Sequence, residues 1–165
     1  MFDSGLYVFL LRLKSASTFE VGALGEQFFP AGWYMYTGSA KKNLHKRVER
    51  HWSVKPTRRW HFDYLSTALD SEPVGAIVVP GDAGISECEL NRLVGNLVGN
   101  HVPVEKFGAS DCKAKCPAHL YFSSAPVSLL ALARVHERAG ILMPGADFWE
   151  GDLQGLGEGG SGSEE

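Results

Sequence analysis

The sequence predicts an α+β domain, an α/β sandwich whose central, mostly antiparallel three-stranded sheet is flanked by helices. Three apolar runs rich in β-branched and aromatic residues indicate the strands, at 5–13, 33–37 and 74–79. Helical spacing of apolar residues follows at 40–52 and 86–97. With 165 residues, of which 44% are hydrophobic and 21% charged, the chain has the size and composition of one globular domain.

The first half of the chain is expected to form a hairpin followed by a helix. The first strand has apolar residues at odd and even positions, which favours a central strand covered on both faces. A turn at 30–32 precedes the second strand, so the two strands pair through a long connection. Gly38 ends the second strand, and Leu44 and Val48 form the apolar stripe of the helix.

The second half of the chain contains further helices and a short strand. The segment 60–69 is either a helix or a short strand that leads into one, and we favour the helix. A last strand is expected at 119–123 and another amphipathic helix at 129–139. The domain is expected to span 1–150. A disordered acidic tail follows at 151–165, because this stretch is rich in glycine and lacks lysine, arginine and aromatic residues.

Cysteine content and hydropathy point to a cytoplasmic protein without a membrane partner. Three cysteines are an odd number, which favours reduced thiols or metal ligands over a disulfide scaffold. The apolar run 6–11 ends at Arg12, far short of the roughly 18 apolar residues of a membrane-spanning helix. Asp3 stands where a secretory signal carries basic residues.

Positive charge is concentrated in one segment, although the formal net charge is -3. Half of the 16 lysine and arginine residues lie between positions 41 and 59, against the single acid Glu49. A local positive potential attracts a polyanion whatever the net charge, so this segment predicts a surface for nucleic acid. The alternative is a solvated helix face. The residues expected to contact phosphates are Lys41, Lys42, Lys46, Arg50, Arg58 and Arg59.

Three short motifs follow one another along the chain: Gly5-Leu6-Tyr7, Tyr36-Thr37-Gly38 and Asn43-Leu44-His45-Lys46-Arg47-Val48. In this order the chain resembles the GIY-YIG nuclease superfamily. It is most similar to a branch of small bacterial and archaeal proteins, some of them joined to endonuclease III-type repair enzymes. The motifs of this branch include Trp60-His61-Phe62-Asp63-Tyr64-Leu65 and Glu87-Cys88-Glu89-Leu90.

The resemblance implies a metal-dependent DNA endonuclease, with a role in DNA repair or processing, in which one of Tyr7 and Tyr36 is the general base. Their strands are expected to be neighbours, so the two hydroxyls can converge. Positive charge from Lys41, Lys42 and Arg47, which are close in sequence, would help a tyrosine to lose its proton. Arg47 and His51 are four residues apart and share one helix face. Arg47 suits stabilisation of transition-state charge, and His51 assists or binds phosphate. Alternatively, the tyrosines are core residues and His51 is an exposed helix-end residue.

The sequence departs from the superfamily at the acidic metal ligand. In the superfamily a single glutamate inside this helix holds the metal, and this chain has Val94 at the equivalent position. The carboxylates of this helix are Glu87 and Glu89, either of which could hold Mg²⁺ or Mn²⁺. We favour Glu87, because Leu90 follows it by three residues. If both acids only favour the helix N-terminus, the chain is a catalytically silent nucleic-acid-binding module that accompanies a repair enzyme.

The sequence also contains a second group of candidate site residues, which includes cysteines and histidines. Cys112, Cys116 and His119 could supply three zinc ligands, with Cys88 or His61 as the fourth. The spacing is irregular for zinc, so reduced buried thiols are favoured over zinc and over a redox role, and a zinc-stabilised domain without a nucleic-acid role is the remaining alternative. The full candidate set is His61, Asp63, Asp111, Cys112, Cys116 and His119. His61 and Asp63 could instead line the pocket of the tyrosines.

Overall fold

A single antiparallel sheet forms the centre of the computed structural model, which describes residues 2–53, 58–110 and 112–145. Its strands lie in the order β6 (Leu120–Ser123), β4 (Gly32–Ala40), β1 (Gly5–Leu13), β5 (Ser71–Pro80) and β7 (Gly140–Leu142). The α+β class and the helix-flanked antiparallel sheet are confirmed. The expected number of three strands is wrong, because the short edge strands β6 and β7 extend the sheet to five.

β1 is the middle strand and pairs along its whole length with β4 on one side and β5 on the other. Its side chains alternate between two apolar layers, with Tyr7 and Phe9 in one and Val8 and Leu10 in the other. This alternation follows from the two-residue period of a strand. Because both layers are buried, the run of apolar residues at 5–13 belongs to a strand covered on both faces, as expected.

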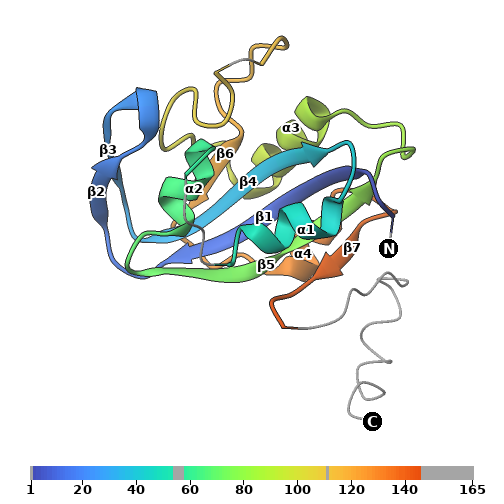
Figure 1. Cartoon of the computed structure of the whole chain (residues 1–165), viewed down its shortest axis with the longest axis horizontal. Helices are drawn as coiled ribbons and strands as arrows, with labels where there is room; N and C mark the ends of the chain where they lie inside the picture. The colour runs from blue at the N-terminus through green and yellow to red at the C-terminus, as the bar shows by residue number, and fades with distance from the viewer. Residues whose placement is uncertain (1, 54–57, 111, 146–165) are drawn as a thin grey trace.

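Helices cover both faces of the sheet (Figure 1). α1 (Leu44–Arg50) and α2 (His61–Ser66) lie on the face that carries Tyr7, and α3 (Glu87–Val98) and α4 (Leu129–Ala133) lie on the other. The segment 60–69 therefore contains the favoured helix. α1 begins later than expected because β4 continues to Ala40, and α4 ends at Ala133 because the chain turns back to pair β7 with β5.

The long connection between β1 and β4 forms a small sheet of its own. It consists of β2 (Ser17–Glu20) and β3 (Glu26–Phe29), joined through the 3-10 helix η1 (Gly22–Leu24). The rings of Phe19 and Phe29 stack with centroids 4.6 Å apart. This hairpin projects from one end of the central sheet (Figure 1).

The C-terminal part of β4, after Tyr36, has no strand on the side away from β1, which leaves room for the candidate site. β6 pairs with β4 only as far as Tyr36 and Leu120. At the next position the N–H of Thr37 donates to the carbonyl of His119 at 2.9 Å, after which the two segments separate. Glu87 in the first turn of α3 interacts with Ser39 of β4, and Gly108 in the connection between α3 and β6 lies against Tyr36. Asp111 and the expected tail at 151–165 lie outside the described residues.

Candidate functional site

Tyr7, Tyr36 and His51 form a buried aromatic group on the α1 side of the sheet. The Tyr7 hydroxyl lies 3.0 Å from Nε2 of His51. The ring of Tyr36 is 6.3 Å from that of Tyr7 and 5.9 Å from that of His51, measured between centroids. The two tyrosines converge as their neighbouring strands predict. His51 is only 1% exposed, so the alternative of an exposed helix-end histidine is wrong.

Two glycines of the sequence motifs lie too close to their neighbours to carry a side chain, and one of them makes room for Tyr7. Gly38 lies opposite Tyr7 in the β1–β4 register, and a Cβ atom there would stand 2.5 Å from the Tyr7 hydroxyl. At Gly5 a Cβ atom would stand 2.1 Å from the carbonyl oxygen of Val79 on β5. Both distances are far below van der Waals contact, so each position requires glycine for packing. The Tyr7 ring therefore lies flat across Gly38 and reaches His51.

Burial determines the protonation of Tyr7. Loss of hydration raises the pKa of Tyr7 well above its ordinary value of 10.0, and the neighbouring Tyr36 raises it further, while Arg47 only partly opposes the shift. The expected help from Lys41 and Lys42 is not seen, since both side chains are exposed and Arg47 alone of the three lowers this pKa. Tyr7 keeps its proton at neutral pH and can donate it to His51.

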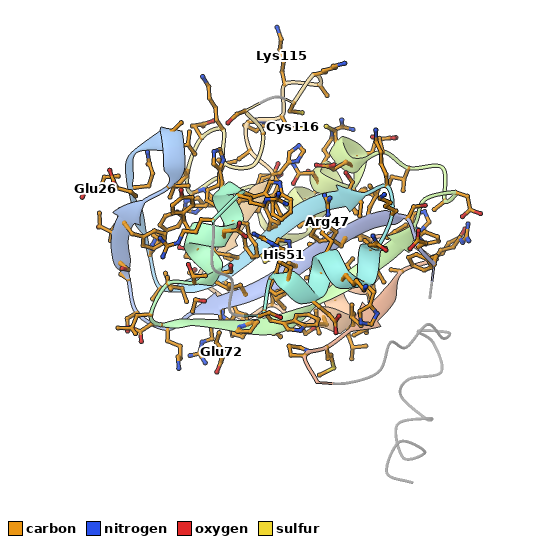
Figure 2. All side chains as sticks on the ribbon, in the orientation of Figure 1. Glu26, Arg47, His51, Glu72, Lys115 and Cys116 are labelled. Carbon is orange, nitrogen blue, oxygen red and sulfur yellow. The ribbon has the colours of Figure 1, made fainter. Side chains whose placement is uncertain are left out.

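Arg47 lies one helical turn before His51 at the rim of the aromatic group (Figure 2). Its Nη1 donates to the backbone carbonyl of Ser39 at 3.0 Å, and its guanidinium lies 5.1 Å from the centroid of the Trp60 ring. These contacts hold a half-buried guanidinium beside the end of β4. Neither Ser39 nor Trp60 was predicted as a site residue, although Ser39 directly follows the Tyr36-Thr37-Gly38 motif and Trp60 begins the motif at 60–65.

Glu87 and Glu89 have different roles in the first turn of α3. Glu89 is exposed and closes a capping box with Ser86, accepting from its N–H at 3.0 Å and donating its own N–H to the Ser86 hydroxyl at 3.1 Å. Glu87 is half-buried, and its Oε2 lies 2.7 Å from Nδ1 of His119. Burial alone would raise the pKa of Glu87, but His119, Ser39 and Arg47 together lower it. Glu87 is therefore ionised and faces the Arg47 side of the site.

Arg50 and Asp63 form a buried ion pair beneath α1. The guanidinium of Arg50 donates to both carboxylate oxygens of Asp63, at 2.7 and 3.0 Å, and lies 4.4 Å from the Trp60 ring centroid. Asp63 also accepts from the N–H groups of Arg59 and Trp60, at 2.7 and 3.0 Å. Arg50 was expected to contact phosphate, but in the structure its guanidinium binds a carboxylate of the chain itself. Asp63 does not join the cysteine cluster.

A shallow pocket of about 310 Å³ opens beside Tyr36. His61 forms part of its wall and accepts the N–H of Gly108 at Nδ1, at 2.8 Å. Arg59 also borders the pocket, and Arg58 lies instead over the ring of Tyr64. The lining residues are Tyr36, Arg59, Trp60, His61, Gly108 and Ser110.

Three lysines are exposed near the start of α1. Lys41 and Lys42 directly follow β4, and Lys46 lies on α1 itself. Within the described ranges, none of the three forms an ion pair with a carboxylate. Their charges therefore face solvent on the same side of the sheet as Arg47. This arrangement leaves the three side chains able to meet an anionic partner.

The cysteines and His119 gather on the other side of Glu87. The ligand atoms of Cys88, Cys112, Cys116 and His119 all lie within 4.8 Å of one another, a group that could hold a metal ion. All three thiols are free. Of the two expected candidates for the fourth member, Cys88 joins the group and His61 does not. Asp111 lies outside the described residues, so its membership in this group stays a prediction.

The fold and the site together define an α+β domain with a helix-covered antiparallel sheet, a buried Tyr-His group beside an arginine, and an adjoining Cys-His cluster. The chain belongs to the family described as Domain of unknown function DUF123, which matches residues 6–141. No match is found among curated proteins or among solved structures. Within the described ranges, no helix has the length and apolar character needed to cross a bilayer.

Proposed function

We propose that the chain is a metal-dependent endonuclease of GIY-YIG type that hydrolyses phosphodiester bonds in DNA. The observation that carries this proposal is the approach of Tyr7, Tyr36 and His51 to one another beside Arg47, with the carboxylate of Glu87 close enough for Arg47 to lower its pKa. Phosphodiester hydrolysis needs a proton acceptor for water, positive charge for the transition state and oxygen ligands for a cation. Each need has a candidate residue in this arrangement.

His51 is the proposed final proton acceptor. Tyr7 is a poor base by itself, because burial keeps it protonated. Its hydroxyl can nevertheless take a proton from water while it passes its own proton to Nε2 of His51, 3.0 Å away. Tyr36 borders the pocket and is the tyrosine that a substrate would meet. Arg47 would then stabilise the negative charge that develops on the phosphate, since a guanidinium matches two phosphate oxygens.

Glu87 is the proposed ligand for Mg²⁺ or Mn²⁺. Mg²⁺ is commonly held by one or two carboxylates together with substrate phosphates, so an ionised Glu87 is a sufficient protein contribution. The metal would polarise the scissile phosphate. Glu89 is less suited, because it is exposed at the start of α3, whereas Glu87 interacts with Ser39 and Arg47. Lys41, Lys42 and Lys46, together with Arg59 at the pocket, are proposed to hold the DNA backbone.

A catalytically silent DNA-binding module that accompanies a repair enzyme is the second candidate. One observation favours it: Val94, at the depth of the superfamily's glutamate, is fully buried in the apolar layer between α3 and the sheet. No carboxylate can act from that position. Binding would then depend on the exposed lysines and fall steeply with salt concentration.

Cleavage of labelled DNA separates the two candidates. Duplex, single-stranded and branched DNAs are incubated with the chain and Mg²⁺ or Mn²⁺. We expect Arg47→Ala to abolish cleavage, with a loss of about 10²-fold or more, as for removal of other transition-state charge contacts. The matched control is Arg134→Ala, which removes the same charge from the exposed end of α4 on the other face of the sheet. Thermal melting of both variants confirms that they remain folded.

The two acids of α3 provide a second comparison. Glu87→Gln should lose metal-dependent cleavage, and Glu89→Gln should retain it, because glutamine also completes a capping box. Full cleavage by Arg47→Ala would refute the assigned site. Salt-dependent retention of DNA without cleavage by the wild-type chain would refute the nuclease and support the binding module.

A further inference from the structure

The Cys-His cluster is built from three separate parts of the chain. Cys88 comes from the first turn of α3, Cys112 and Cys116 come from the connection between α3 and β6, and His119 immediately precedes β6. Four nitrogen and sulfur ligands without a carboxylate are the donor set of a structural zinc site. A catalytic zinc site would keep one position open for water. The ligand count therefore favours a closed site.

The spacing of the ligand atoms fits one metal ion better than a disulfide. The Sγ atoms of Cys88 and Cys112 are 3.4 Å apart, and Sγ of Cys88 is 3.8 Å from Nε2 of His119. Tetrahedral zinc with bonds of about 2.3 Å to sulfur and about 2.0 Å to nitrogen separates its ligands by about 3.5 to 3.8 Å. A disulfide would need its sulfurs at about 2.05 Å. These two distances thus match the edges of a zinc tetrahedron, and all four ligand atoms lie within 4.8 Å of one another.

The two nitrogens of His119 have divided roles. Nε2 faces the thiol of Cys88, and Nδ1 lies 2.7 Å from the carboxylate of Glu87. Histidines that bind zinc through one nitrogen usually donate the other N–H to a carboxylate or carbonyl. His119 is only 4% exposed, so this orientation is fixed by packing. Nε2 of His119 therefore faces the thiols in the orientation expected of a zinc ligand.

Backbone N–H groups of the connection between α3 and β6 lie near the thiol of Cys112. The backbone N–H groups of Cys116 and Ala114 both face the Cys112 thiol. Groups that stabilise a thiolate also suit a sulfur bound to metal. Lys113 and Lys115 are exposed on either side, where their charge can offset that of several thiolates.

We infer that Cys88, Cys112, Cys116 and His119 bind one Zn²⁺ ion in a closed tetrahedral site, and that Glu87 orients His119 from outside it. The site would tie the 99–119 connection to α3. This connection contains no helix or strand over its described residues, yet its Gly108 packs against Tyr36 and holds His61 at the pocket. Zinc would therefore stabilise one wall of the pocket without contacting a substrate. The inference does not depend on the proposed nuclease activity.

Metal analysis of the intact chain tests the zinc site. The chain is purified under reducing conditions without chelator, and we expect about one zinc per chain. Replacement with Co²⁺ should give a thiolate-to-cobalt charge-transfer band and the intense visible bands of tetrahedral cobalt, both saturating at one equivalent. Wild-type protein that retains neither metal after gel filtration, or cobalt spectra without the thiolate band, would overturn the inference.

Variants assign the ligands and the role of Glu87. Cys112→Ser with Cys116→Ser should lose the cobalt spectrum, and His119→Asn should weaken zinc binding, whereas the matched control His136→Asn should bind as wild type. Glu87→Gln should weaken zinc about 10- to 100-fold in a chelator competition, while Glu89→Gln should not. Wild-type affinity in the double cysteine variant would overturn the site. Wild-type affinity in Glu87→Gln would overturn the orienting role.

Discussion

Replacing Asp63 with asparagine changes a carboxylate that is fully buried and surrounded by donors. One oxygen accepts from Nη1 of Arg50, and the other accepts from Nη2 of Arg50 and from the N–H groups of Arg59 and Trp60. The amide group of asparagine must direct an N–H at one of these donor sets. The substitution also leaves the Arg50 charge without its partner carboxylate in a site where Asp63 is 0% exposed.

The expected cost is about 3 kcal/mol of the free energy of unfolding. Loss of one partner from a buried ion pair costs about 3 to 5 kcal/mol, and Arg50 retains 23% exposure, which places the value at the lower end. For a domain of this size, that cost lowers the melting temperature by about 6 to 12 °C. Urea unfolding at neutral pH, followed by circular dichroism and tryptophan fluorescence, measures it.

The matched control for this substitution is Glu49→Gln. Glu49 is 49% exposed and lies 3.3 Å from His45, so its removal should change stability by less than about 0.5 kcal/mol. If Asp63→Asn costs less than about 1 kcal/mol, or no more than the control, the Arg50–Asp63 pair is not the buried anchor of α2 that its contacts indicate.

The same pair predicts a dependence of stability on pH. Burial alone would raise the pKa of Asp63, but Arg50 and the N–H groups of Trp60 and Arg59 outweigh burial and lower it below 3.8. A lowered pKa in the folded state stabilises the fold at pH values above 3.8, and this contribution disappears as the pH falls through the folded-state pKa. The stability difference between wild type and Asp63→Asn should therefore be constant near neutral pH and shrink only in acid.

Two further substitutions test the packing of the site and the start of α3. Gly38→Ala places a methyl group 2.5 Å from the Tyr7 hydroxyl, so we expect a loss of about 1 to 3 kcal/mol in urea and a changed NMR signal of the His51 ring. An unchanged ring signal would contradict the close approach of Tyr7 to Gly38. Ser86→Ala removes the acceptor for the Glu89 N–H and should cost about 1 kcal/mol, whereas Ser86→Thr should cost less. Equal losses in both Ser86 variants would argue against the capping box.

Strong patterns in the sequence predicted the middle of the sheet and the edge strand β6, but not the edge strand β7 or the small hairpin of β2 and β3. The runs at 5–13 and 74–79 are long and apolar enough to identify strands, and both are strands of the sheet. β7 has three residues and β2 and β3 have four each, too short for a two-residue period to stand out. The convergence of Tyr7 and Tyr36 was predictable because it requires only that the two strands pair.

Some features of the candidate site could be predicted from the sequence, and others depend on tertiary contacts. Ser86 and Glu89 have the spacing of a capping box, so the sequence already contained a signal that separates Glu89 from Glu87. Nothing local could show that Arg50 would meet Asp63 rather than a phosphate, since the two side chains come from different helices. The choice of Cys88 over His61 likewise depends on the path of the chain between α3 and β6.

The position of β1 has a consequence for synthesis of the protein. β1 comes first along the chain among the strands of the central sheet, yet its two partners are β4, which ends at Ala40, and β5, which ends at Pro80. At about 5 to 20 residues per second, the ribosome needs about 2 to 8 seconds to add the residues between those two points. Throughout that interval a nascent apolar strand keeps one unpaired edge, the kind of surface that recruits other chains. Slower translation across residues 41–80 therefore lengthens the time during which this edge is open to pairing with other chains.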